Sequence, residues 1–326
     1  MCCITRMKTR RMKLLLNHYK GKIIIAGLLF AMMLASAANT ASAQVLHEQG
    51  FLPAAPAFDR ERFNIVIISE AGAATLATIG LQYLWYKKFP HSHFHFFNDN
   101  NEWLNMDKVG HAATAYNIAA FQYNMMRWTG VNKTTSLWVG IGTALAYMSM
   151  IEISDGFSKE WGFSPGDMIS NVSGIAFFGV QQAVWKQQRI LLQYSYHGTI
   201  FPQYNPGMLG RNLPERMLKD YNGQSYWLSF NVSSFFKKAN IPKWITADFG
   251  YGAGGMTGAV TNPREVNGKA IPSFSRERKL FFSVGGAFTA NKNISYPSWI
   301  NIFKVPTPAL EYNLTESKVK LHALYY

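Results

Sequence analysis

The chain has 326 residues, of which 48% are hydrophobic and 15% charged, and 32 Lys and Arg against 18 Asp and Glu give a formal net charge of +14. Seven of the basic residues lie among the first 43, so the remainder carries a net charge of +7 and has no dense Lys/Arg run of the kind that binds nucleic acid. Both cysteines, Cys2 and Cys3, also lie in this first segment, which excludes disulfides and thiol chemistry from the rest of the chain.

The N-terminus has the pattern of a targeting segment. Basic residues precede the apolar run "IIIAGLLFAMMLASAA", and "ASA" follows at Ala41 to Ala43. A charged region, a short apolar region and a small-residue cleavage site predict a cleavable signal peptide over residues 1–43, with an uncleaved anchor as the alternative. Residues 44–62, which contain Pro53, Pro56 and a polar "DRER", are predicted to be irregular.

Four apolar helices are expected next, at about 63–88, 107–128, 134–153 and 167–186, and form a predicted helical domain over residues 63–188. Each approaches the ~20 residues needed to cross a bilayer. However, Ser, Thr, Gly, Asn and Gln are scattered through them, and the mean hydropathy of the chain is only −0.06. We therefore expect a buried or membrane-apposed bundle rather than a multi-span inner-membrane protein.

Residues 189–326 change to a period of two. Six segments are short, aromatic and β-branched, and are separated by Gly, Pro and Asn: "ILLQYSYH", "YWLSFNVSSFF", "ITADFGYGAGG", "KLFFSVGGAFTA", "PALEYNLTE" and "KVKLHALYY". They predict antiparallel strands. Six is fewer than the eight strands of the smallest outer-membrane barrels, so we expect an antiparallel β-sheet or partial β-barrel and an α+β fold class overall.

Three polar groups interrupt the apolar helices. They are "DKVGH" with Asp107, Lys108 and His111, "EISD" with Glu152 and Asp155, and "DMISNVSG" with Asp167 and Asn171. A spacing of four places Asp107 and His111 on one helix face, and Asp167 and Asn171 on another, whereas Glu152 and Asp155 are three apart at a helix end. We expect the second, third and fourth helices to bring these side chains together inside one bundle.

Two interpretations of this constellation remain open. In the functional one, Asp107, His111, Glu152, Asp155 and Asp167 are catalytic. They could surround a divalent ion such as Zn, Mn or Fe(II), with Asp107, His111, Glu152 and Asp167 as its ligands. Alternatively, His111 is a general base oriented by a carboxylate, and Lys108 or Asn171 stabilises developing negative charge. In the structural one, the same groups form a closed hydrogen-bond and ion-pair network that fixes helix register. The four acids outnumber the neighbouring lysine and histidine, so the local charge does not balance.

The motifs D-K-x-x-H, E-x-x-D and D-x-x-x-N-x-x-G, each on an apolar helix, resemble the YfiM-like family of predicted periplasmic lipoproteins, a domain of unknown function. More distantly they are similar to VanZ-like membrane proteins. The resemblance covers about residues 83–197, and it implies an exported envelope protein without implying an activity. No lipid-attachment cysteine follows the apolar run of this chain.

These observations predict an exported, membrane-associated cell-envelope protein with a structural or assembly role. The alternative is a metal- or carboxylate-dependent hydrolase that acts on an envelope lipid or glycan. The expected location is the outer membrane or its periplasmic face, with the inner membrane as the alternative. The expected partner is a membrane lipid or another envelope component. A nucleotide is not expected, because the glycine-rich "YGAGGMTG" at 251–258 lacks the lysine of a phosphate-binding loop and no helical pattern follows it.

Overall fold

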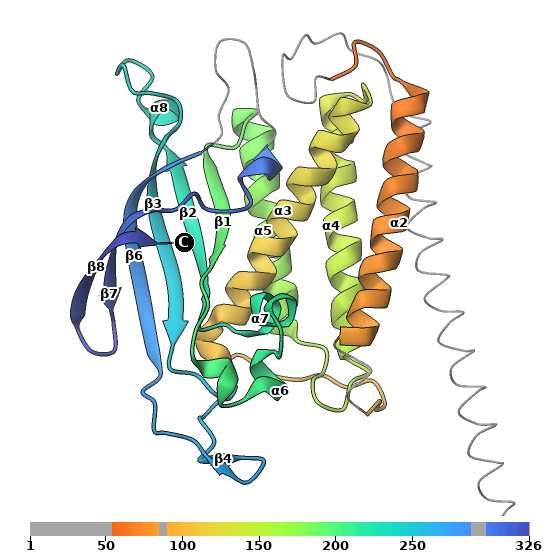
Figure 1. Cartoon of the computed structure of the whole chain (residues 1–326). Helices are drawn as coiled ribbons and strands as arrows, with labels where there is room; N and C mark the ends of the chain where they lie inside the picture. Colours follow the sequence, from red (N-terminus) through yellow and green to blue (C-terminus); the bar gives the residue numbers. More distant parts are fainter. Residues whose placement is uncertain (1–53, 85–89, 288–297, 326) are drawn as a thin grey trace, which may run out of the picture.

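The computed structural model describes residues 54–84, 90–287 and 298–325. Helices occupy the first half of the chain and an antiparallel sheet the second, which confirms the α+β prediction (Figure 1). The predicted signal peptide at 1–43 lies outside the described residues. The part of the predicted irregular segment that is described, from residue 54, is non-helical until the first helix begins at Arg60.

Four long helices lie close to their predicted positions. They are α2 (Arg60–Leu84), α3 (Met106–Trp128), α4 (Lys133–Asp155) and α5 (Pro165–Trp185). Two of them begin at recognisable caps. The Asn132 side chain accepts a hydrogen bond from the backbone N–H of Thr135, and Ser164 Oγ accepts one from that of Asp167. These caps set the starts of α4 and α5.

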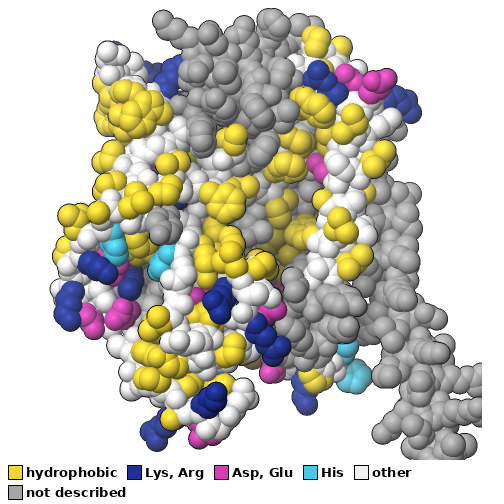
Figure 2. Space-filling view, in the orientation of Figure 1, with side chains coloured by type: hydrophobic (Ala, Val, Ile, Leu, Met, Phe, Trp, Pro, Cys, Tyr) yellow, Lys and Arg dark blue, Asp and Glu magenta, His cyan; other side chains and the backbone are white. Residues whose placement is uncertain are grey.

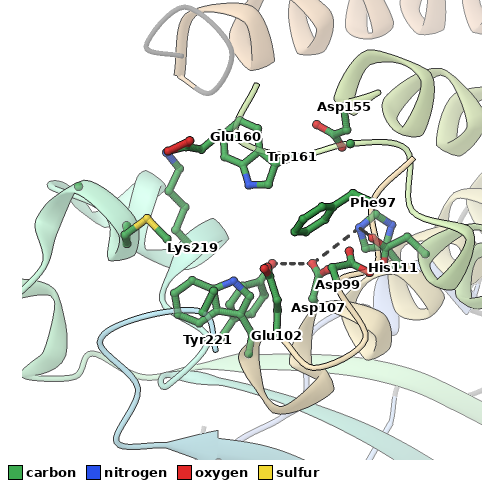
Figure 3. Close-up of a pocket in the computed structure, with 16 residues that line it drawn as sticks. Phe97, Asp99, Glu102, Asp107, His111, Asp155, Glu160, Trp161, Lys219 and Tyr221 are labelled. Carbon is green, nitrogen blue, oxygen red and sulfur yellow. Dashed lines mark hydrogen bonds and ion pairs between the residues drawn. The ribbon is translucent and has the colours of Figure 1, made fainter. Parts of the chain in front are cut away.

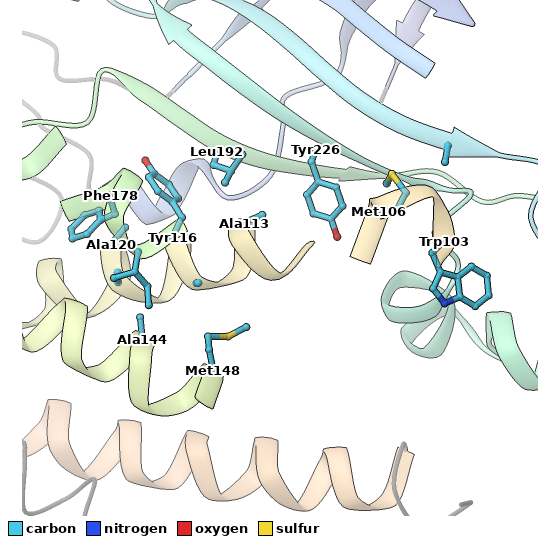
Figure 4. Close-up of a cluster of buried hydrophobic side chains, with 14 of the residues drawn as sticks. Trp103, Met106, Ala113, Tyr116, Ala120, Ala144, Met148, Phe178, Leu192 and Tyr226 are labelled. Atoms are coloured by element: carbon cyan, nitrogen blue, oxygen red, sulfur yellow. The ribbon is translucent and has the colours of Figure 1, made fainter. Parts of the chain in front are cut away.

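The helices α3, α4 and α5 pack tightly because small residues meet at their crossings. A Cβ added at Gly140 of α4 would lie 2.7 Å from the carbonyl oxygen of Ala119, and one added at Gly174 of α5 would overlap the carbonyl oxygen of Ala112. Tyr116, Met148 and Phe178 fill the core beside these crossings (Figure 4). In contrast, α2 packs on α3 mainly near its own N-terminus, through a cluster that includes Phe63 and Val66.

The sheet is an antiparallel meander in the order β1-β2-β3-β6-β7-β8. Its strands are β1 (Ile190–Tyr196), β2 (Gln224–Asn231), β3 (Ile245–Gly254), β6 (Glu277–Gly286), β7 (Thr307–Asn313) and β8 (Lys318–Tyr325). All six correspond to the six predicted segments. A small hairpin of β4 (Glu265–Val266) and β5 (Lys269–Ala270) lies between β3 and β6.

Several short helical segments were not predicted from the sequence. They are η2 (Trp103–Asn105), η3 (Phe201–Gln203), α6 (Pro206–Leu209), α7 (Leu213–Lys219), α8 (Val232–Phe235) and η4 (Ser298–Asn301). Each has seven residues or fewer, too few for a helical period to stand out in the sequence.

The sheet curls strongly. The hydroxyl of Tyr325 on β8 lies 2.9 Å from Ser225 Oγ on β2. These strands are four positions apart in the sheet, a separation of about 19 Å if the sheet were flat. Backbone hydrogen bonds from Tyr194 to Ile302 and from Lys304 to Tyr194 also cover the outer edge of β1. The sheet is therefore a partial barrel, and its convex side packs on α3 through β1 and β2.

Candidate functional site

The polar residues predicted from the three motifs lie at one end of the helical bundle. Because α3 and α5 run antiparallel to α4, the starts of α3 and α5 meet the end of α4 (Figure 1). The chain enters α3 through an unusual turn, in which Trp103, Leu104 and Asn105 have φ angles of 47°, 53° and 66°. Three consecutive residues other than glycine in this region are costly and are found where the surrounding structure holds the backbone at a functional site.

Lys108 lies among three carboxylates. Its Nζ donates to Asp99 Oδ1 at 2.6 Å and to Asp167 Oδ1 at 2.7 Å, and lies 3.5 Å from Asp107 Oδ2. Ser164 Oγ also donates to Asp99 at 2.6 Å, which ties the loop before α3 to the start of α5. Burial alone would lower the pKa of Lys108, but the surrounding carboxylates outweigh it and raise that pKa. Lys108 therefore stays charged.

His111 is held between two different sets of groups. Its Nδ1 lies 3.1 Å from Asn171 Oδ1 and 3.2 Å from Glu152 Oε1. Its Nε2 lies 3.7 Å from Asp107 Oδ1 and 3.9 Å from Asp167 Oδ2. With two acceptors beside Nδ1, we assign the proton of the neutral ring to that nitrogen. The Nε2 lone pair then faces two carboxylates.

This arrangement favours a positive charge beside Nε2. Burial would lower the pKa of His111, but Asp107, Asp167 and Glu152 together raise it. Burial, reinforced by Asp107, raises the pKa of Asp167 to about 8. A proton or a cation between these groups relieves the repulsion among them.

A divalent metal ion fits the same position. Ligand atoms of Asp107, His111 and Asp167 all lie within 4.8 Å of one another. Among the residues that the structure describes, these three form the candidate metal-binding group. With bonds of about 2.1 Å, ligand atoms around an ion lie roughly 3–3.5 Å apart, so these atoms, which lie within 4.8 Å of one another, would need to move closer to bind one ion. One imidazole nitrogen and two carboxylates suit Zn, Mn or Fe(II).

Neighbouring side chains support this triad. Glu152, predicted as a fourth ligand, lies instead beside the other ring nitrogen of His111, where its side chain is 1% exposed. A carboxylate at that position orients a metal-binding imidazole and increases its basicity. Tyr221 Oη donates to Asp107 Oδ1 at 2.7 Å and so fixes the carboxylate on the opposite side.

A cavity of about 310 Å³ opens beside the triad (Figure 3). Its apolar walls include Phe97, Trp103, Trp161, Met208 and Tyr221. Its acidic lining comprises Asp99, Glu102, Asp107, Asp155, Glu160 and Asp167, accompanied by His111 and Lys219. The predicted residue Asp155 therefore reaches the cavity, but Figure 3 shows it apart from Asp107 and His111, on the other side of Phe97.

Three members of the site, Asp99, Glu102 and Tyr221, were missed by sequence reasoning. Asp99 belongs to a loop without helical periodicity, although the polar "NDNNE" shortly before α3 marks an unusual concentration of side chains that can bind ions. Tyr221 follows α7, more than a hundred residues after Asp107, in the half of the chain that was expected to form only strands. Nothing in a single sequence connects it to α3.

Comparison with known families agrees with the resemblance noted above. Residues 95–182 match the family described as "Predicted periplasmic lipoprotein (DUF2279)". The matched segment contains α3, α4 and most of α5, and with them all seven residues of the predicted constellation. No curated protein and no solved structure matches the chain. The more distant VanZ-like resemblance stays a prediction.

Proposed function

We propose that this chain is a cell-envelope protein with a divalent-metal-dependent hydrolytic site at the end of its helical bundle. One observation carries the proposal. Glu152 and Asn171 hold Nδ1 of His111, so that Nε2 faces Asp107 and Asp167 at the wall of a cavity. A closed structural network would not need a cavity of about 310 Å³ beside its acids.

The residues of the site would divide the work. Asp107, His111 and Asp167 would hold the ion, which when bound would supply an activated water and polarise the bond to be cleaved. Glu102 also lines the cavity, and burial together with Asp99 raises its pKa. A carboxyl group whose pKa is raised towards neutrality suits general acid–base catalysis, so we assign proton transfer to Glu102.

The walls of the cavity favour an amphiphilic substrate. Trp103, Trp161 and Phe97 offer apolar surfaces, and acidic side chains line the same cavity. We therefore retain an envelope lipid or glycan as the substrate class, and we place the protein at the outer membrane or its periplasmic face. The matched family of predicted periplasmic lipoproteins supports an exported location.

A structural or assembly role is the second candidate, and a different observation favours it. Lys108 joins Asp99 to Asp167, and Asn171 donates to Glu152 at 3.4 Å while contacting His111. These contacts connect α3, α4, α5 and the preceding loop, so they would also fix the relative positions of the helices.

Metal binding by the purified full chain separates the two candidates. We expect one equivalent of Mn²⁺ or Zn²⁺ in elemental analysis and titration calorimetry. The Asp107→Ala/His111→Ala variant should lose at least 100-fold in affinity, whereas His322→Ala, which removes a histidine that contacts Glu311 far from the site, should bind normally. Hydrolysis of chromogenic ester and phosphodiester probes should follow metal occupancy.

A natively folded wild-type protein that binds neither ion would refute the metal site. If the double variant then also lowered the thermal unfolding midpoint, the network interpretation would replace it. If metal bound but no probe were hydrolysed, the site would be metal-binding without the proposed chemistry.

A further inference from the structure

Large apolar side chains lie exposed along the outer sides of three helices, and those along α2 are visible in Figure 2. They include Ile68 and Leu76 on α2, Trp138 on α4, and Ile169, Val180 and Val184 on α5, each between 61% and 73% exposed. Two of these helices, α2 and α4, are long and apolar enough to cross a membrane. In the most apolar stretch of each, only 11% of the residues of α2 and 33% of those of α4 are buried. Soluble monomers rarely expose so much contiguous apolar surface.

The convex side of the partial barrel is apolar as well. Phe249, Phe282, Val284, Leu310, Val319 and Leu321 point to this side and are between 40% and 75% exposed. The concave side buries polar groups such as Gln193, Ser229 and Asp248 together with a hydrophobic cluster of Trp227, Phe281, Ala309 and Tyr325. A sheet with one face in water has the reverse distribution, whereas apolar-out and polar-in is the pattern of strands that face lipid. The helix-side and sheet-side residues named in these two paragraphs are called the apolar belt below.

On the helical side, the belt coincides with segments that lack charged residues, whereas on β8 the belt residues Val319 and Leu321 alternate with the exposed Lys318 and Lys320. The segments 112–126 of α3, 134–151 of α4 and 168–185 of α5 contain no Asp, Glu, Lys or Arg. Eighteen helical residues span about 27 Å, close to the ~30 Å hydrocarbon thickness of a bilayer. The single acid in the middle of α2, Glu70, has both carboxyl oxygens shielded from solvent.

Hydroxyl groups within the belt are satisfied by their own helices. Thr75 and Thr78 of α2 donate to the carbonyl oxygens of Ala71 and Ala74 at 2.7 and 2.8 Å. Ser173 of α5, which is exposed, donates to Ile169 O at 2.7 Å. Such side chains need no water partner, so they do not prevent burial of the belt in an apolar medium.

We propose that a lipid bilayer covers the apolar belt and that the cavity lies at the polar boundary of that bilayer. A second copy of the chain is the competing occupant, but one two-fold interface would cover one side of the molecule. The belt includes both the helices and the opposite, sheet-bearing side (Figure 1). This inference is independent of the metal site, because it rests on different residues. It also revises the expectation of a merely membrane-apposed bundle.

Site-directed labelling tests the proposal. In the full chain with Cys2→Ser and Cys3→Ser, single cysteines at Leu76, Val180 and Leu321 are coupled to a polarity-sensitive fluorophore. Matched controls carry the label at Leu213 and Val260, which are 62% and 54% exposed outside the belt. Each protein is reconstituted into vesicles of phosphatidylcholine and phosphatidylglycerol, and quenching by iodide is compared with quenching by brominated lipid.

We expect the three belt labels to emit at shorter wavelength than the controls, to be quenched by brominated lipid, and to be at least tenfold less accessible to iodide. Belt labels that remain as accessible to iodide as the controls would overturn the proposal. Protection without vesicles, together with a doubled mass in light scattering, would also overturn it and assign the belt to a second copy.

Discussion

Two of the regions in which the protein buries ionisable groups are built differently. In the partial barrel, Lys304 Nζ lies 2.9 Å from Asp248 Oδ2, with side-chain exposures of 1% and 0%. Ser283 donates to the same carboxylate and Lys304 donates to Thr307, each at 2.9 Å. In the helical bundle, Lys108 and His111 face four acids beside a cavity.

The difference shows what burial alone does not reveal. The Asp248–Lys304 pair balances its own charge, and neither residue lines the cavity, so the pair needs only a structural explanation. The bundle combines an excess of acids with access to a cavity. Charge imbalance and access together, rather than burial, are what support a binding site.

The largest expected effect lies in the balanced region. Replacing Lys304 with Met leaves Asp248 buried without its partner, which should lower the free energy of unfolding by about 3–5 kcal/mol. Lys318→Met is the matched control, because Lys318 is 75% exposed and pairs with Glu316 at the surface, and it should leave the free energy of unfolding almost unchanged. Denaturation followed by circular dichroism measures both. Equal losses would contradict the proposed contrast.

Metal affinity at the bundle site should rise with pH. The pKa of His111 is raised and that of Asp167 is raised to about 8, so both groups hold protons to higher pH than ordinary side chains and a metal must displace those protons. Between pH 6 and 8, we expect the apparent affinity for Mn²⁺ to increase roughly tenfold per pH unit for each proton that the metal displaces. Calorimetry in buffers of different ionisation enthalpy counts the protons. An affinity independent of pH across this range would exclude His111 as a ligand.

Glu152→Gln should weaken metal binding by about 10–100-fold, because the imidazole of His111 loses the carboxylate beside Nδ1. Glu311→Gln is the control, since Glu311 contacts His322 at 2.7 Å in the partial barrel. It should leave metal affinity unchanged. An unchanged affinity in Glu152→Gln as well would remove Glu152 from the site.

Tyr221→Phe should have the smallest effect, a decrease of a few-fold in metal affinity. The substitution removes one hydrogen bond to Asp107 and keeps the ring that lines the cavity. Comparison with Tyr251→Phe, whose hydroxyl donates to the Leu104 carbonyl rather than to a ligand, controls for a general loss of hydrogen bonding. A larger loss in Tyr251→Phe would show that the turn before α3 matters more than the orientation of Asp107.

Much of the fold could be predicted because its signals are local. Long, mainly apolar segments bounded by caps such as Asn132 and Ser164 define the helices, and a period of two defines the strands. The motif spacings correctly placed Asp107 and His111 on one side of α3. The position of Glu152 relative to the two ring nitrogens depends on the rotation of an imidazole, which spacing does not determine. Tyr221 depends on how the two halves pack, which is not a local property.

Gly174, the last residue of the D-x-x-x-N-x-x-G motif, determines how closely α5 approaches α3. It contributes no functional group, yet a side chain there would overlap the carbonyl oxygen of Ala112, and Asn171, which contacts His111, lies one helical turn before it. The glycine therefore encodes a distance between two helices, and the asparagine uses that distance. A homologue that kept every acid and the histidine but carried a larger residue at this position would retain the functional groups of the site and lose their geometry.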